Sequence, residues 1–159
     1  MRSLLPLLAL TALFATGALA ATAMPYNPKA DAKAEVRHAL SEARANHEPV
    51  LVFFGANWCE DCRSLARSLK SGRNAKLMAD HFNIVKVDVG NFNRNLSVDK
   101  RFGDPIHKGI PAAVILSPRG KVLYATRAGE LANARHMSNQ GVYDFFRKRL
   151  AALHHHPAR

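Results

Sequence analysis

The sequence predicts an α/β domain, in which strands and helices alternate along one chain. Short apolar runs of strand length recur between segments whose apolar residues follow a helical period. The order that results is a first helix followed by strand, helix, strand, helix, two strands and a last helix. Without its first twenty residues the chain keeps about 140 of its 159, which suffices for one domain with a single core.

The first twenty residues have the features of an export signal. Arg2 supplies a positive start, residues 4–19 are mostly Leu and Ala, and Ala18-Leu19-Ala20 fits the small-x-small pattern that precedes cleavage. An uncleaved membrane anchor is the alternative. However, one proline, two threonines and one glycine shorten the apolar core below the ~20 residues of a comfortable span. We therefore expect residues 1–20 to be a cleaved signal peptide and the mature protein to be periplasmic or secreted.

The first half of the domain is expected to hold two helices around a strand. Residues 29–46 are rich in Ala, Glu and Arg, with apolar residues at helical spacing, and residues 50–54 form an apolar run typical of a buried strand. The next helix begins near Cys59, and Ser71-Gly72-Arg73 is expected to break it.

The second half is expected to hold three strands and two helices. Residues 84–89 read as a strand, and a short helix lies within 91–102. Strands over 112–116 and 122–125 flank a Ser-Pro-Arg-Gly-Lys turn, which signals a hairpin. The last helix spans 137–153.

These boundaries define the expected domain organisation. A linker over 21–29 follows the signal peptide, the folded domain occupies 30–153, and a His-rich tail over 154–159 is expected to be disordered.

The only two cysteines, Cys59 and Cys62, stand where a predicted strand ends and a helix begins. Unpaired N–H groups and the positive end of the dipole at a helix start favour a thiolate on the first cysteine. The second lies about one helical turn away and can close a disulfide from the same face. We expect Cys59 to be the nucleophile and the more exposed sulfur, and Cys62 to be the resolving thiol of a redox-active disulfide.

A Cys-x-x-Cys pair can also belong to a zinc site or form a purely structural disulfide. A zinc site needs two further Cys or His ligands, and none of the eight histidines has the paired spacing beside the cysteines. A purely structural disulfide across a four-residue loop would constrain little chain entropy. No metal and no cofactor are predicted. A metal- or haem-maturation chaperone that holds a soft metal ion at the pair is the alternative function, and a structural interaction domain with vestigial redox groups is a third.

Two motifs carry a resemblance to a known family: Phe53-Phe54-Gly55-Ala56-Asn57-Trp58-Cys59-Glu60-Asp61-Cys62 and Gly109-Ile110-Pro111-Ala112. The chain resembles the thioredoxin-like superfamily from about residue 30 to residue 150, and within it the small exported bacterial proteins with a Trp-Cys-x-x-Cys site. The resemblance implies a three-layer α/β/α sandwich with a central mixed sheet. It also implies thiol–disulfide oxidoreductase activity.

The same resemblance suggests the residues that contact substrate. Trp58 is expected to flank the site, and Ile110-Pro111 is expected to be the cis-proline loop that faces the cysteines. An Ile before this proline occurs in reducing thioredoxins, which favours a reductase of protein disulfides.

The sequence differs from thioredoxin at three places, and each changes which residue roles the resemblance implies. Glu60-Asp61 replaces the Gly-Pro between the cysteines, and two carboxylates there should raise the pKa of Cys59 and make the couple less oxidising. Phe53 stands where thioredoxin has a buried Asp, so proton transfer falls to water or another group, for which Glu60 is the candidate. The stretch 101–108 is longer than expected in thioredoxin and is expected to be a loop insertion; added substrate specificity near the site is the alternative.

The charge balance bears on partners. The formal net charge of +11 predicts attraction to acidic partners that weakens with salt. Nucleic acid is not expected, because the basic residues are scattered and not interleaved with aromatics. The expected partners are protein disulfide substrates and a membrane-bound thiol electron donor, and the protein is expected to be a monomer.

Overall fold

A four-stranded mixed sheet forms the middle of the molecule, in the order β2-β1-β3-β4. The computed structural model describes residues 24–155, so the predicted signal peptide and the last four residues lie outside it. β1 (Val50–Gly55) runs parallel to β2 (Asn83–Asp88) and antiparallel to β3 (Ala112–Leu116), and β3 forms a hairpin with β4 (Val122–Ala125). β1 and β3 are buried along their whole length, which explains why both read as continuous apolar runs.

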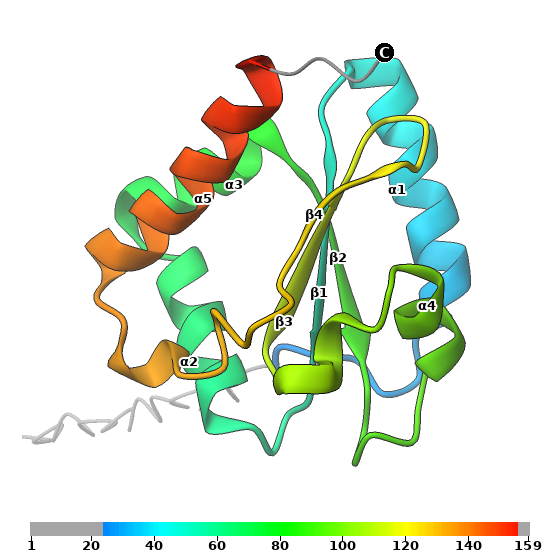
Figure 1. The fold of residues 1–159 in the computed structure, drawn as a ribbon, viewed down its shortest axis with the longest axis vertical. Coiled ribbons are helices and arrows are strands. Elements are labelled where there is room, and N and C mark those ends of the chain that lie inside the picture. The colour runs from blue at the N-terminus through cyan, green and yellow to red at the C-terminus, as the bar shows by residue number, and fades with distance from the viewer. Residues whose placement is uncertain (1–23, 156–159) are drawn as a thin grey trace, which may run out of the picture.

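Helices cover both faces of this sheet (Figure 1). α1 (Ala32–Asn46) and α4 (Leu96–Arg101) lie on one face, and α2 (Glu60–Leu69), α3 (Gly72–His81) and α5 (Asn139–His155) lie on the other. Alternate β1 residues supply the two cores: Val52 and Phe54 pack on the α1 side, whereas Leu51 and Phe53 pack on the α5 side. The predicted three-layer α/β/α sandwich with a mixed central sheet is confirmed.

Local signals explain where the helices begin and end. Asp31 caps α1, because its carboxylate accepts a hydrogen bond from the backbone N–H of Ala34 at 3.0 Å. The predicted break after α2 is also present: α3 begins at Gly72, whose φ of +47° suits glycine. Two short 3₁₀ turns, η1 (Pro105–Lys108) and η2 (Ala134–His136), complete the connections.

The structure moves two of the expected boundaries. The part of the predicted linker that the structure describes is packed against the domain, because Tyr26 is 3% exposed. α5 continues through His155, so the first two residues of the predicted disordered tail are helical, whereas residues 156–159 lie outside the described chain. Within residues 24–155, no helix combines the length and the apolar character needed to cross a bilayer.

Candidate active site

The two cysteines lie where β1 leads into α2, as predicted. Cys59 is the N-cap of α2, with an extended backbone, and its sulfur accepts a hydrogen bond from the N–H of Cys62 at 3.1 Å. A disulfide joins Cys59 to Cys62, whose Cα atoms are 5.2 Å apart. The Cys59 sulfur therefore lies against the unpaired N–H groups of the helix start, where a thiolate formed on reduction is stabilised.

Both sulfur-bearing residues are shielded, and Cys59 is the more accessible of the two. Its exposed fraction is 5%, against 1% for Cys62. Cys59 is thus the more exposed cysteine, as expected, whereas its role as nucleophile and that of Cys62 as resolving thiol remain predictions.

The loop before β3 forms one side of that edge. The Ile110–Pro111 peptide bond is cis, as the resemblance implied. The carbonyl oxygen of Ile110 lies 3.7 Å from the Cys59 sulfur, because β3 is hydrogen-bonded to β1 and its N-terminal end meets the C-terminal end of β1. The predicted substrate-contacting loop is therefore next to the disulfide.

An exposed aromatic pair forms another side. Trp58 is 55% exposed and its indole N–H donates to the carbonyl oxygen of Gly90 at 2.9 Å. Its ring packs edge-on against Phe92, with 6.1 Å between centroids, and Phe92 is itself 44% exposed. The φ of Phe92 is +58°, a conformation that bulky side chains rarely adopt. A tight loop holds it, in which the N–H groups of Asn93 and Arg94 both donate to the carbonyl oxygen of Val89.

The space behind the disulfide is filled by Tyr26. Its backbone exchanges two hydrogen bonds with the side-chain amide of Asn57, at 3.0 and 2.7 Å. A Cβ at Gly55 would collide with the Tyr26 ring and lie 2.9 Å from the Cys62 sulfur, so glycine is required at this close approach. Burial, and then the negative charge of Asp88, raise the pKa of Tyr26, so the phenol is neutral at physiological pH.

The two carboxylates between the cysteines are held by Arg135, which lies in η2. The Arg135 backbone N–H donates to Asp61 Oδ1 at 2.8 Å, and its Nη1 lies 3.3 Å from Glu60 Oε2 and 3.7 Å from Asp61 Oδ2. Glu60, the candidate for proton transfer, is thus an ion-pair partner whose side chain is 62% exposed. Its catalytic role remains a prediction.

Phe53, which the resemblance aligns with the buried Asp of thioredoxin, lies in the core on the α5 side. It is 1% exposed and packs edge-on against Phe146, with centroids 5.7 Å apart. The stretch 101–108 forms the end of α4 and η1, and leads directly to Gly109 and the cis-proline loop. It is therefore an ordered connection to the site.

Sequence reasoning missed Tyr26, Phe92 and Arg135. Tyr26 fell in a segment assigned as a linker, and Phe92 lies in an Asn-rich loop with no periodic signal. Arg135 is 75 residues from Glu60, and nothing local in the sequence links the two.

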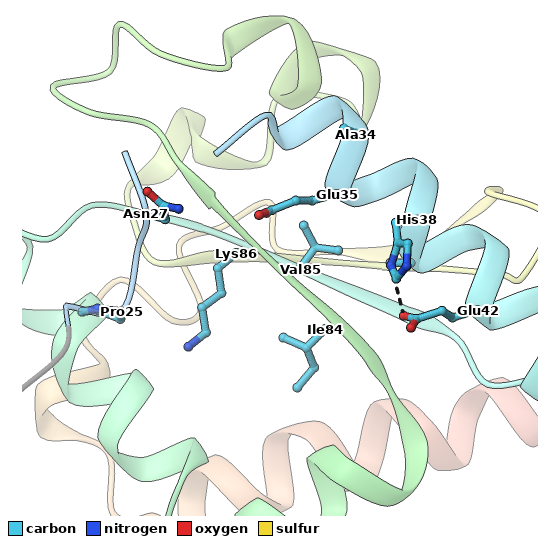
Figure 2. A pocket seen from close by; sticks show the side chains of 10 residues that line it. Pro25, Asn27, Ala34, Glu35, His38, Glu42, Ile84, Val85 and Lys86 are labelled. Carbon is cyan, nitrogen blue, oxygen red and sulfur yellow. Dashed lines mark ion pairs between the residues drawn. The ribbon is translucent and has the colours of Figure 1, made fainter. Parts of the chain in front are cut away.

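No group of three or more His, Cys, Asp and Glu side chains is arranged to hold a metal ion in the part of the chain that the structure describes. A pocket of about 550 Å³ lies between α1 and β2 (Figure 2). Glu35 and His38 from α1 and Ile84 and Lys86 from β2 line it. It contains no cysteine and is separate from the disulfide.

Comparison with known proteins places the chain among thioredoxin-like proteins. The sequence model of a family described as thioredoxin-like matches residues 31–118. A disulphide isomerase from Xylella fastidiosa Temecula1 is 54% identical in sequence. Its crystal structure superposes with a TM-score of 0.79, over 80% of this chain and 98% of that chain.

More distant solved structures share the fold. A DsbH oxidoreductase is 19% identical, with a TM-score of 0.55 over 72% of this chain and 81% of that chain. A thioredoxin from Thermus thermophilus is 18% identical, with a TM-score of 0.51 over 77% of this chain and 94% of that chain. No curated protein matches the sequence.

Proposed function

This chain belongs to the thioredoxin-like family and is a thiol–disulfide oxidoreductase, and we propose that it reduces the disulfides of other proteins through Cys59 and Cys62. The observation that carries the proposal is the disulfide at the start of α2, with the Cys59 sulfur at the N-cap and facing the cis-proline loop. This arrangement stabilises a thiolate on one sulfur and keeps the second within bonding distance.

The reaction follows from these positions. In the reduced enzyme the Cys59 thiolate attacks a substrate disulfide, forms a mixed disulfide and releases one substrate thiolate. Cys62 then loses its proton and attacks the Cys59 sulfur, which breaks the mixed disulfide and releases the second substrate thiolate. Two electrons pass to the substrate, the Cys59–Cys62 disulfide closes, and the proton of Cys62 goes to a departing thiolate. An external dithiol must then reduce the enzyme.

Substrate contacts are assigned to the rim around Cys59. We place the apolar part of an extended substrate segment on Trp58 and Phe92, and its backbone along Ile110 and Pro111. The exposure of the aromatic pair and the approach of the Ile110 carbonyl to the sulfur support this placement.

The cellular setting belongs to the same proposal. The leader-like first twenty residues support export to the periplasm or beyond, where a membrane-bound thiol donor would supply electrons to a monomeric protein. Residues 30–153 are proposed as the catalytic domain, with Tyr26 as an additional anchor.

Disulfide isomerisation is the second candidate, because the 54% identical structure is of a disulphide isomerase. An isomerase would use the same Cys59 attack, but the substrate's own thiolate would resolve the mixed disulfide, and the enzyme would leave in its reduced form. The two candidates therefore differ in whether the Cys59–Cys62 disulfide forms during turnover.

An insulin assay with dithiothreitol tests the proposal. The wild-type protein should accelerate reduction of the insulin disulfides, and Cys59→Ser should abolish this activity because the attacking sulfur is gone. Cys62→Ser should accumulate mixed disulfides, visible on non-reducing gels and by mass spectrometry. Turnover by Cys59→Ser at the wild-type rate would reject the assignment.

A further inference from the structure

The dipeptide between the cysteines places two carboxylates in the first turn of α2. Carboxylates at a helix start are favourable toward the dipole, but each adds negative charge beside Cys59. On their own, Glu60 and Asp61 would oppose a third negative charge and raise the pKa of the Cys59 thiol.

Arg135 supplies the compensating charge from a distant part of the chain. One guanidinium nitrogen reaches both carboxylates, at 3.3 Å to Glu60 and 3.7 Å to Asp61, while the Arg135 backbone N–H donates to Asp61 at 2.8 Å. The interaction of Arg135 with Asp61 is the stronger of the two, because the Asp61 side chain is only 13% exposed. The Glu60 side chain is 62% exposed, so water screens its ion pair.

The position of Arg135 is fixed by the core beneath it. Leu131 and Ala134, just before it in the same segment, are 0% and 2% exposed. The backbone of η2 therefore rests on the α5-side core, and both the backbone N–H and the guanidinium of Arg135 reach the start of α2.

The other charged groups around this end of the molecule already have partners or lie at the solvent surface. Arg63 donates to the carbonyl oxygens of Asn57 and Trp58, and Arg94 lies 3.5 Å from Asp88. The exposed His136 accepts from Arg135 Nε at 3.2 Å. Among these groups of the described chain, Arg135 is the cation that contacts both carboxylates between the cysteines.

We propose that Arg135 is a positioning residue that keeps the Cys59 thiol acidic by pairing with Glu60 and Asp61. The pair of negative charges beside the sulfur is reduced to a net single charge, and the thiolate population at neutral pH rises. As the sequence alone indicates, the helix start favours the Cys59 thiolate and the two carboxylates oppose it; Arg135 adds a third contribution that offsets the carboxylates. This inference rests on the proposed function, since it concerns the attacking sulfur of that reaction.

The test is the pH dependence of iodoacetamide alkylation at Cys59 in the reduced full-length protein, measured by mass spectrometry. In Arg135→Gln the midpoint should move to higher pH, and the rate at pH 7 should fall about threefold to tenfold, as for a pKa rise of half a unit to one unit. Arg135→Lys keeps the positive charge, so the midpoint of Cys59 alkylation in this variant should be close to the wild-type midpoint. Arg119→Gln removes the same charge at the β3–β4 turn, at the opposite end of the sheet from the cysteines, and should leave the profile unchanged.

Two results would overturn the inference. The first is an Arg135→Gln profile that coincides with that of Arg119→Gln. The second is an Arg135→Lys variant that loses reactivity as fully as Arg135→Gln, which would assign a role in packing.

If Arg135→Gln does not fold, the Cys59 alkylation profile of Asp61→Asn provides the test. This variant keeps an acceptor for the Arg135 N–H and should lower the Cys59 midpoint, so an unchanged midpoint would overturn the inference. If the wild-type protein does not reduce insulin, the proposed function is rejected. The alkylation profile of Cys59 would still test the role of Arg135 independently of that result.

Discussion

Phe92 shows how the backbone can place a side chain against Trp58, the residue that precedes Cys59. Its left-handed φ of +58° costs on the order of 1 kcal/mol for an aromatic residue, and the hydrogen bonds to Val89 hold the loop in this shape. The result is an aromatic ring that is 44% exposed and packs edge-on against Trp58. The exposed Trp58–Phe92 pair is the surface on which we have proposed that the apolar part of a substrate rests.

Phe92→Ser should lower kcat/KM for insulin reduction about threefold to tenfold, because an apolar substrate contact worth about 1 kcal/mol is lost. The reduction potential should not change, since no charge near the sulfurs is altered. Ile84→Ser is the matched control, because Ile84 is also an exposed large apolar side chain, 40% exposed, but lines the separate pocket beside β2. Equal kcat/KM for the two variants would remove Phe92 from the substrate surface.

At the scale of an element, a buried carboxyl group joins α4 to η1, the turn that leads into the cis-proline loop. Asp99 of α4 is buried and its carboxylate accepts the N–H of Ile106 at 3.3 Å, which ties η1 to α4 just before the cis-proline loop. Burial, together with the neighbouring Asp104 carboxyl, raises the pKa of Asp99 to about 6. Asp99 therefore holds a proton in the folded protein at pH values where it has lost it in the unfolded chain.

This difference makes a defined prediction for stability against pH. Because the folded pKa is above the unfolded one, the Asp99 contribution is fully present below about pH 4 and is lost as the pH rises through about 6. Asp99→Asn stays neutral and keeps an acceptor for Ile106, so it should be more stable than wild type at pH 7 by on the order of 1 kcal/mol. The gain should vanish near pH 4.

Urea unfolding at pH 4, 5.5 and 7 measures this effect. Asp144→Asn removes the same charge from an exposed site on α5 and is the control. A wild-type protein that matches Asp99→Asn at pH 7, or a difference that grows toward pH 4, would contradict the assignment.

Elements were predicted well where the local sequence determines them. The strands over 112–116 and 122–125 have their predicted bounds, because a Pro-Arg-Gly turn separates two apolar runs. The start of α2 is predictable as well, since a buried strand ends at Gly55, four residues before the first cysteine. The end of α5 is harder to predict, because His154 and His155 give no clear stop signal and the helix continues through them.

At the scale of the whole molecule, two of the residues missing from the sequence analysis, Tyr26 and Arg135, depend on tertiary packing. Tyr26 reaches the back of the disulfide through hydrogen bonds to Asn57, 31 residues away, and Arg135 reaches the front from 74 residues beyond Asp61. The sequence shows which groups carry the chemistry. The fold decides which distant residues surround them, and these surroundings leave the two sulfur-bearing residues largely buried.

At the scale of the whole molecule, β1, α2, the cis-proline loop and η2 of the thioredoxin-like sandwich converge on one disulfide, and we propose that this pair reduces protein disulfides. The equilibrium reduction potential of the Cys59–Cys62 couple against glutathione tests this most directly. We predict a value close to that of thioredoxin, about −270 mV, and below about −230 mV in any case. A value near −180 mV would favour the isomerase, and one near −120 mV an oxidant, and either would contradict the reducing role.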